Sequence, residues 1–346
     1  GIRDVERSRG LGDVYKRQMR AGVIVLGSLL ARFGKAKVSL PGGCAIGTRP
    51  VDIHLFGLKK LGAKIKIKNG YIFAEAKQGL IGTQIKFPSI SVGATENVII
   101  AASLAKGITY LRNCACEPEI KNLTDFLNKM GANITWSGKR EIKIIGCKKL
   151  KQVSHQIMFD RIEAGTFIIA GALIGKKLKI LGIQTNLLNT EIKILRKMGV
   201  KMQINKDHIN ILHSPKIKPV KIKTEPYPGF PTDLQAQIMV LMTRANGTSK
   251  IKENIFENRF MHVPELNRMG AKIKVSGNLS KIDGIKSLYG AEVMATDLRA
   301  SVSLVLAGLI AKNRTIINRV YHLDRGYENL ENKLRKCGAN ISRTNY

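Results

Sequence analysis

A short motif recurs five times in this chain, and it constrains the fold more strongly than any other feature of the sequence. In each copy an apolar residue or cysteine precedes a glycine, and a small or branched residue, a polar residue and Ile or Met follow it. A glycine directly after a helical segment is typical of a left-handed helix end, and the residues behind it read as a strand. The glycines stand 68 to 71 residues apart, at Gly62, Gly131, Gly199, Gly270 and Gly338. This spacing predicts one structural unit in five copies.

Each copy also contains an earlier helix that is rich in small residues. These helices are predicted at residues 20–26, 93–99, 163–169, 232–238 and 296–302. A short strand, a loop, the second helix and a pair of strands follow, and the pair in residues 64–75 turns at Asn69-Gly70, a typical hairpin dipeptide. The unit is therefore predicted as β-α-β-α-β-β, an α/β fold. Because segments such as 301–310 are apolar nearly all round, we expect the helices inside and the sheets outside.

Residues 1–18 stand apart from the repeats, since they are charged, contain glycine and lack helical or strand periodicity. We interpret them as a foreign leader and exclude them from the fold. The first visible unit then begins directly with its helix, so that we expect about one unit to be missing before it. A domain boundary is most plausible at residues 152–160. This gives a first domain of residues 19–155 with two units and a second domain of residues 156–346 with three.

The formal net charge is +33, from 58 Lys and Arg against 25 Asp and Glu, which raises the question of nucleic-acid binding. The lysines are spread through the whole chain, however, and they often alternate with Ile and Asn, as in residues 64–69. Lys, Ile and Asn have A/T-rich codons, so a genome rich in A and T would produce the same composition. We favour this bias, together with anionic small substrates, over a nucleic-acid partner, which stays an alternative.

The sequence favours a cytoplasmic protein without a membrane anchor. Its apolar runs are shorter than the roughly 20 residues that cross a bilayer. Residues 19–31 could be read as a secretory signal, but equivalent helices recur later, so we interpret them as a buried helix. The five cysteines lack paired spacings, which fits a reducing compartment, and Cys114 and Cys116 have no second Cys or His pair at zinc spacing. No metal and no cofactor are predicted.

The main candidate site is the segment 39–54, SLPGGCAIGTRPVDIH. Three glycines and two prolines describe a loop that can approach a ligand closely and can move. The loop presents one thiol, Cys44, and one guanidinium group, Arg49. For an isolated Gly-Gly-Cys the plainer interpretation is a surface turn with a small buried cysteine. The other motifs of the chain decide against that interpretation.

Five motifs in order along the chain resemble the UDP-N-acetylglucosamine 1-carboxyvinyltransferase family of enolpyruvyl transferases. They are PGGCAIGTRPVD at 41–52, FPTD at 230–233, FENRFMHVPEL at 256–266, ATDLRAS at 295–301 and DRGY at 324–327. The resemblance implies a two-domain inside-out α/β barrel of six such units, of which five are present here. It also implies a cytoplasmic enzyme of peptidoglycan synthesis, on which cell shape and cell division depend and which the antibiotic fosfomycin targets.

The family reaction adds a sugar hydroxyl to C2 of phosphoenolpyruvate while C3 is protonated, and then eliminates phosphate. By resemblance Cys44 is the proton donor and forms a thioether adduct with phosphoenolpyruvate, and fosfomycin alkylates it. A thiol with a pKa near ~8.5 is a suitable acid at neutral pH. Asp233 is by resemblance the base or proton relay for the hydroxyl. Its place at a helix start also suits an N-cap, and the two roles are compatible.

Four arginines stand in the motifs of separate units. By resemblance Arg49 and Arg325 hold the phosphate of phosphoenolpyruvate, and Arg259 and Arg299 lie near its carboxylate. Guanidinium forks suit both groups, because each can accept two parallel hydrogen bonds.

By resemblance the nucleotide sugar binds to residues of both domains. These residues are Arg20, Arg49, Pro50, Val51, Asp52, Ile53, Ser89, Ile90, Ser91, Val92, Gly93, Asp233 and Ile255. Ser91 and Gly93 at a helix N-terminus offer free backbone N–H groups, which suit a diphosphate. The family often has a basic residue in place of Ser89, which puts a side-chain contact to phosphate at this position in doubt. Glu117 and His54 also match family positions, and either a cleft or a packing role suits them.

One element of the family pattern is absent from the sequence. The family's Lys-Asn pair that binds phosphoenolpyruvate lies upstream of every residue present here. We therefore predict that residues 1–346 alone are inactive and fold poorly, because an unfilled barrel position exposes apolar helix faces.

Three alternatives to this function stay open. A shikimate-type enolpyruvyl transferase shares the architecture but lacks the Gly-Gly-Cys loop. A basic nucleic-acid-binding repeat protein would show steep salt dependence in DNA binding. A degenerate paralogue would keep the sugar site without turnover.

Overall fold

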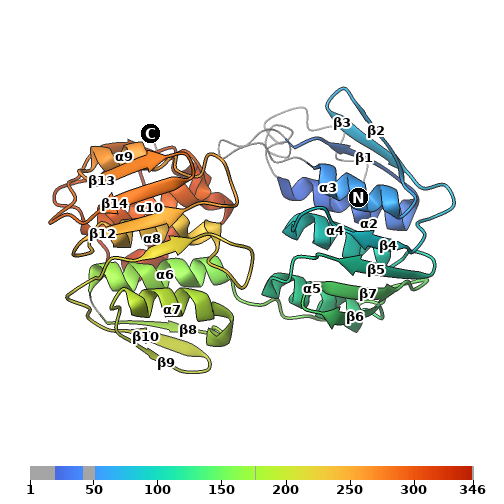
Figure 1. The fold of residues 1–346 in the computed structure, drawn as a ribbon, viewed down its shortest axis with the longest axis horizontal. Coiled ribbons are helices and arrows are strands. Elements are labelled where there is room, and N and C mark those ends of the chain that lie inside the picture. Colours follow the sequence, from blue (N-terminus) through green and yellow to red (C-terminus); the bar gives the residue numbers. More distant parts are fainter. Residues whose placement is uncertain (1–19, 42–50, 176, 345–346) are drawn as a thin grey trace. The chain divides into compact units, whose positions relative to one another are not determined.

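The computed structural model describes residues 20–41, 51–175 and 177–344. These residues form two compact units, one from residues 20–41 with 51–158 and the other from residues 159–175 with 177–344. Both units alternate short helices and short strands along the chain (Figure 1). The predicted α/β class is therefore confirmed.

Helices fill the inside of the first unit. They are η2 (Arg20–Ile24), which continues into α2 (Val25–Phe33), then α3 (Asp52–Lys60), α4 (Val92–Ala102) and α5 (Pro118–Lys129). Helix α4 packs against α2, α3 and α5. Its residues Ala94, Val98, Ile99 and Ala101 are fully buried, because its sequence is small or apolar on most sides. The segment at residues 20–33 is thus a helix packed in a core, as expected.

Two sheets cover these helices. One has the order β1 (Lys35–Ser39), β3 (Tyr71–Glu75), β2 (Lys64–Lys68), and the other has the order β4 (Gln84–Lys86), β5 (Ile108–Arg112), β7 (Glu141–Ile145), β6 (Asn133–Gly138). Strand β4 runs parallel to β5, and the remaining pairs are antiparallel. Buried and exposed residues alternate along β3, where Ile72 and Ala74 face the helices.

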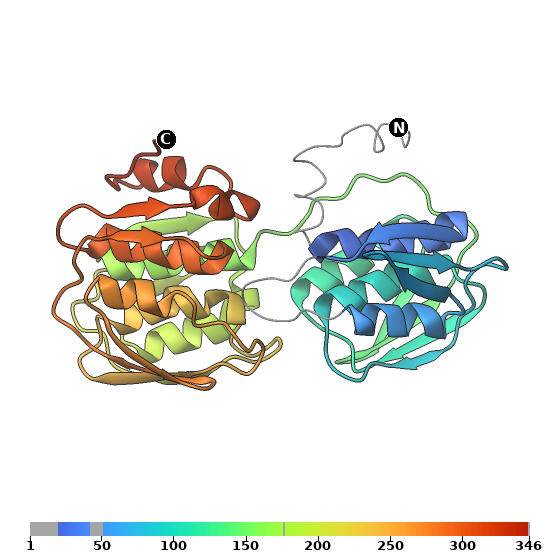
Figure 2. The same cartoon turned by 90° about the horizontal axis from the view of Figure 1, so that it is seen from above.

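The second unit repeats this arrangement with three helices side by side, α6 (Arg161–Ile174), α8 (Gln235–Met242) and α10 (Leu298–Ile310) (Figure 1). Further helical segments connect them to the strands. These are η3 (Thr185–Leu188), α7 (Asn189–Lys197), η4 (Thr232–Leu234), α9 (Val263–Arg268), η5 (Val320–Arg325) and α11 (Leu330–Lys336). Figure 2 shows the strands around these helices. The expectation of helices inside and sheets outside holds in each unit.

Three sheets belong to the second unit. Their orders are β8 (Leu178–Leu181), β10 (His208–Ile211), β9 (Met202–Ile204); then β11 (Lys221–Lys223), β12 (Thr248–Lys252), β14 (Leu279–Asp283), β13 (Lys272–Ser276); and β15 (Glu292–Met294) beside β16 (Ile316–Asn318).

The outer face of the sheet β11–β12–β14–β13 carries a row of lysines. Lys221 pairs with Lys250, Lys250 with Lys281, and Lys281 with Lys274, so that four lysines stand side by side across the strands. All four residues are exposed. Like charges directly opposite one another destabilise a sheet, so this row lowers stability at low ionic strength.

The five repeat glycines all adopt the left-handed backbone that the motif predicts. Their φ angles lie between 85° and 100°. The predicted hairpin is also present, with Asn69 and Gly70 at positive φ between β2 and β3. The expected strand after Gly338 is wrong, since residues 339–344 form no strand. Ala339 and Ile341 pack instead on the buried cluster around Tyr327 and Leu330.

Candidate active site

Asp233 lies in the turn η4, which leads into helix α8. The N-cap residues are Pro231 for η4 and Leu234 for α8, so the expectation that Asp233 is an N-cap is wrong. The chain enters α8 through a 3-10 turn, which places Asp233 inside the turn and not before it. Its carboxylate is therefore directed at side chains from elsewhere in the unit.

Two arginines share the carboxylate of Asp233. Arg259 Nη2 donates a hydrogen bond to Oδ1 at 2.5 Å, and Arg299 Nη2 donates to Oδ2 at 3.4 Å. The arginine side chains are 4% and 13% exposed, whereas that of Asp233 is 41% exposed. The second terminal nitrogen of Arg299, Nη1, is buried and has no hydrogen-bond partner among the described residues. The structure thus brings three predicted site residues together and leaves a spare donor beside them.

Local sequence explains why the two guanidinium groups stay in place. Asp297 is the N-cap of α10 and accepts hydrogen bonds from the backbone N–H groups of Arg299 and Ala300, at 2.8 and 3.1 Å. The guanidinium carbon of Arg299 lies 5.4 Å from the ring centre of Tyr327, and that of Arg259 lies 5.4 Å from the ring centre of Phe256. Both arginines are therefore held by a cation–π contact besides their ion pair.

The pKa of Arg299 follows from this environment. Burial lowers it, but the Asp233 and Asp160 carboxylates and Tyr327 together raise it by more, so that the pKa lies above the ordinary value. Burial raises the pKa of Tyr327 in turn, although the neighbouring Arg299 lowers it. Arg299 is therefore a permanent cation and Tyr327 a neutral phenol at neutral pH.

A buried polar network lies beneath Asp233. The Nε2 of Gln237 donates to the backbone carbonyl of Asp233 at 2.9 Å and to Oγ1 of Thr166 at 3.2 Å, and Thr166 Oγ1 lies 2.9 Å from the Tyr327 hydroxyl. This network fixes the backbone of Asp233 from the core side. No motif of the sequence indicated Gln237 and Thr166, although a glutamine inside the apolar run of α8 is a detectable signal.

Glu253 ties the turn of Asp233 to the next loop. It is 2% exposed, and its carboxylate accepts hydrogen bonds from Thr224 and Thr232 hydroxyls and from the backbone N–H groups of Ile255 and Phe256. A buried carboxylate with four donors is well satisfied. Glu253 therefore positions both the turn that carries Asp233 and the predicted nucleotide-sugar contact Ile255. No motif of the sequence indicated this role of Glu253.

His262 supports Arg259 from behind. It is fully buried, and burial lowers its pKa to about 4. Its Nε2 lies 3.2 Å from the sulfur of Met239 on α8. The ring is therefore neutral at neutral pH and acts as a packing residue between α8 and the loop of Arg259.

In the first unit, predicted nucleotide-sugar residues gather at the start of α4. Ser91 is the N-cap and accepts a hydrogen bond from Ala94 N at 3.3 Å. Gly93 allows a close approach of the two helices, because a Cβ there would lie 3.0 Å from the ring of the buried His54 on α3. Asn97 of α4 in turn contacts His54 Nδ1 at 3.1 Å. These contacts hold the N-terminal turns of α3 and α4 together.

The family model for EPSP synthase (3-phosphoshikimate 1-carboxyvinyltransferase) matches residues 7–334. A relative from Pelagibacter ubique (strain HTCC1062), named UDP-N-acetylglucosamine 1-carboxyvinyltransferase, is 63% identical over 329 residues, which cover 95% of this chain and 79% of the relative. The chain belongs to the UDP-N-acetylglucosamine 1-carboxyvinyltransferase family.

Other comparisons agree with this membership. A relative of the same name from Gluconacetobacter diazotrophicus is 54% identical over 94% of this chain and 78% of its own length. Among solved structures, the enolpyruvyl transferase NikO from Streptomyces tendae superimposes with a TM-score of 0.83 at 26% identity, covering 92% of this chain and 76% of its own. The resemblance predicted from the motifs and the prediction of a transferase are confirmed.

The shikimate-type alternative is not favoured by the comparisons. EPSP synthase from Acinetobacter baumannii shares the fold, with a TM-score of 0.69, 94% of this chain and 79% of that chain covered, but only 19% identity. Identities of 54 to 63% occur instead with relatives named for UDP-N-acetylglucosamine.

The remaining predicted site residues are placed as follows. Val51 is buried just before α3, Asp52 is exposed in its first turn, and Ile53 is half-buried beside them. Arg20 is the first residue of η2. Cys44, Arg49 and Pro50 lie outside the described residues.

Ser89, just before α4, and Val92, the first residue of α4, are exposed, whereas Ile90 and Ser91 are half-buried. Arg325 ends η5 with an exposed side chain. Among the described residues it does not join the hydrogen-bonded group around Asp233.

A carboxylate cluster also lies in the first unit. Burial, together with the nearby Glu119 and Glu117, raises the pKa of Glu96 on α4 from 4.5 to about 7. Within residues 20–41, 51–175 and 177–344 no three His, Cys, Asp or Glu side chains are arranged as metal ligands. No helix of this described part is long and apolar enough to span a membrane.

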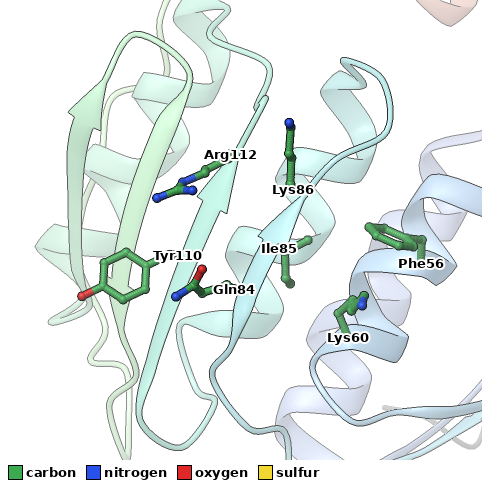
Figure 3. Close-up of a pocket in the computed structure, with 7 residues that line it drawn as sticks. All are labelled: Phe56, Lys60, Gln84, Ile85, Lys86, Tyr110 and Arg112. Carbon is green, nitrogen blue, oxygen red and sulfur yellow. The ribbon is translucent and has the colours of Figure 1, made fainter.

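A hollow of about 310 Å³ opens along β4, away from the predicted residues. Phe56 and Lys60 of α3, Gln84 and Lys86 of β4, and Tyr110 and Arg112 of β5 are among its lining residues. Figure 3 shows that Arg112 points away from Lys60 and Lys86. The cations do not converge on one point, and none of the predicted site residues lines the hollow.

Proposed function

We propose that this protein transfers the enolpyruvyl group of phosphoenolpyruvate to the 3-hydroxyl of UDP-N-acetylglucosamine and releases phosphate. The observation that carries the proposal is the carboxylate of Asp233 between two buried arginines, with the unsatisfied Nη1 of Arg299 beside it. All three residues stand in motifs of the family to which the chain belongs. The reaction would be the first committed step of peptidoglycan synthesis in the cytoplasm.

The residues divide into acid, base and cations. In the addition step the hydroxyl O–H bond breaks, its proton goes to Asp233, the oxygen bonds to C2, and the Cys44 thiol gives its proton to C3. In the elimination step the bond from C2 to the phosphate oxygen breaks and C3 returns a proton to the Cys44 thiolate, while the proton on Asp233 leaves with phosphate. Preorganised cations stabilise the charge that develops at the phosphate and carboxylate.

We assign the phosphate to Arg49 and Arg325 and the carboxylate to Arg259 and Arg299. Arg259 and Arg299 support this assignment with two guanidinium groups that already bind one carboxylate. On this proposal Cys44 is also the residue that forms the adduct with phosphoenolpyruvate and that fosfomycin alkylates.

The nucleotide sugar would contact the start of α4 and the residues around it. The capped N-terminus at Ser91 and Gly93 carries the positive end of the helix dipole and suits a diphosphate. Arg20, the segment Arg49–Ile53 and Ser89–Val92 would complete this contact, together with Asp233 and Ile255. Exposed Asp52 and Ser89 are available for such a ligand.

The proposal is tested by phosphate release from phosphoenolpyruvate with either UDP-N-acetylglucosamine or shikimate 3-phosphate as acceptor. Release is measured for residues 1–346 and, in parallel, for these residues joined to the part of the Pelagibacter ubique relative that they do not match. We expect any turnover to require the nucleotide sugar. Turnover with shikimate 3-phosphate instead would overturn the proposal.

Alkylation of Cys44 by fosfomycin provides a second measurement on residues 1–346. We expect UDP-N-acetylglucosamine, but not shikimate 3-phosphate, to change its rate. An equal effect of DNA at 0.15 M salt would favour the nucleic-acid alternative.

A further inference from the structure

The two arginines assigned to the substrate carboxylate are already occupied by a carboxylate of the protein. Arg259 binds one oxygen of Asp233 and Arg299 the other. A planar group that takes one hydrogen bond on each oxygen is also what phosphoenolpyruvate offers with its own carboxylate. Asp233 therefore stands where the substrate group should bind.

The arginines are held by contacts other than those to Asp233. Arg259 lies over Phe256, Arg299 lies over Tyr327, and the backbone of Arg299 is fixed by the cap at Asp297. Their side chains are nearly buried. Loss of the Asp233 carboxylate thus leaves two oriented cations that need another anion, since an uncompensated buried charge is costly.

Asp233, in contrast, can move its side chain without moving its backbone. Its carbonyl is held by Gln237 from below, while its side chain is 41% exposed. Rotation about the side-chain torsions is enough to carry the carboxylate from the arginines toward solvent. The spare Nη1 of Arg299 offers an entering ligand one donor that Asp233 does not use.

On the basis of the proposed function, we infer that the carboxylate of Asp233 occupies the place of the substrate carboxylate between the two arginines. Phosphoenolpyruvate displaces it, and the freed carboxylate then acts as the base. A carboxylate that accepts hydrogen bonds from two guanidinium groups is a weak proton acceptor. Once displaced, the same carboxylate becomes a stronger acceptor for the proton of the sugar hydroxyl. The base is therefore active only after the donor substrate has bound.

The test compares the binding of phosphoenolpyruvate alone to the wild type and to Asp233→Asn, by calorimetric titration at 0.15 M salt. The asparagine keeps the size of the side chain but cannot form either ion pair. Because the substrate no longer competes with an internal anion, we expect the Kd to fall by about 10-fold. Inorganic phosphate lacks a carboxylate, and its Kd should change by less than about 2-fold.

Two further variants separate the possible outcomes. Asp283→Asn removes the same charge from the exposed strand β14 and should leave the Kd for phosphoenolpyruvate unchanged. Arg259→Lys keeps the charge but loses the fork and should weaken binding. If the Kd is unchanged or higher in Asp233→Asn while Arg259→Lys binds more weakly, Asp233 does not compete with the substrate carboxylate. The proposed carboxylate site at the two arginines is then still supported. If none of these variants changes binding, the proposed carboxylate site itself is wrong.

Discussion

The arginines around Asp233 and the lysine row on β11–β12–β14–β13 both gather positive charge in the second unit, but they hold it in opposite ways. Arg259 and Arg299 are nearly buried, lie over aromatic rings and share one carboxylate. Lys250 and Lys281 stand in a cross-strand row on an exposed face. Exposed charges are screened by salt and water, whereas desolvated and oriented charges can select a ligand. The net charge alone therefore indicates little about function.

The largest effect on the binding of phosphoenolpyruvate should come from replacing a buried arginine with lysine. Arg259→Lys keeps the charge, but one ammonium group cannot match the fork on a carboxylate, so we expect the Kd for phosphoenolpyruvate to rise by about 100-fold. The reverse exchange on the sheet, Lys250→Arg, is the matched control and should leave binding unchanged. Titration of both variants with phosphoenolpyruvate measures the two Kd values. Equal changes in Kd in Arg259→Lys and Lys250→Arg would mean that only the total charge determines binding.

A half-buried carboxyl group in the first unit, Glu96, is the opposite case, because its charged neighbours carry the same sign as its own ionised form. Arg299 gains a compensating carboxylate, whereas Glu96 lies near Glu117 and Glu119, and its pKa is raised to about 7. The folded state therefore holds a proton that the unfolded chain has released. The free energy of unfolding falls as pH rises from 4.5 to about 7, and stays reduced above that pH.

Glu96→Gln should remove this loss of stability at high pH, because glutamine does not ionise. We expect the variant to gain about 2 kcal/mol over the wild type at pH 8 and almost nothing at pH 4.5, by urea unfolding at each pH. Glu119→Gln serves as a partial control, because it removes only one of the neighbours that raise the pKa. A gain that is constant across this pH range would refute the ionisation of Glu96 as its cause.

A carboxylate near the buried arginines and a carboxylate on the sheet with the lysine row should also differ in their contribution to stability. Asp297 accepts hydrogen bonds from two backbone N–H groups at the start of α10, so Asp297→Ala should cost about 1 kcal/mol and loosen Arg299. Asp283 lies on the exposed sheet, where it bonds Thr248 and Lys281, and Asp283→Ala should change stability far less. Thermal unfolding of both variants at pH 7 gives the comparison. A larger loss in Asp283→Ala would contradict it.

Local sequence rules predicted the repeat but not the packing of its polar residues. Glycine at positive φ is a local requirement, and all five repeat glycines meet it. The bond between Gln237 and Thr166 joins residues 71 positions apart, and no local pattern encodes it. Asp233 was misread as an N-cap because a 3-10 turn and an α-helix begin with the same residue types.

Family motifs extended the prediction of the site beyond local rules. They brought Asp233, Arg259 and Arg299 into one group before any contact was known, and the structure places them within hydrogen-bond distance. The motifs did not indicate that the arginines bind Asp233 itself. That pairing depends on side-chain geometry, because the same motifs would also be compatible with side chains that do not contact one another. The roles of these residues in catalysis stay predictions.

The smallest expected effect on stability lies in the lysine row, where each lysine faces another lysine across the strands. Lys250 stands directly between Lys221 and Lys281. Lys250→Thr keeps a good strand residue and removes the central ammonium group, so we expect a gain of about 0.3 kcal/mol at 20 mM salt. The gain should vanish at 1 M salt, where the screening length is only ~3 Å. Lys148→Thr, an exposed position outside any strand, controls for the change in net charge. A gain that persists at high salt would show that strand propensity, and not repulsion between lysines, limits this face.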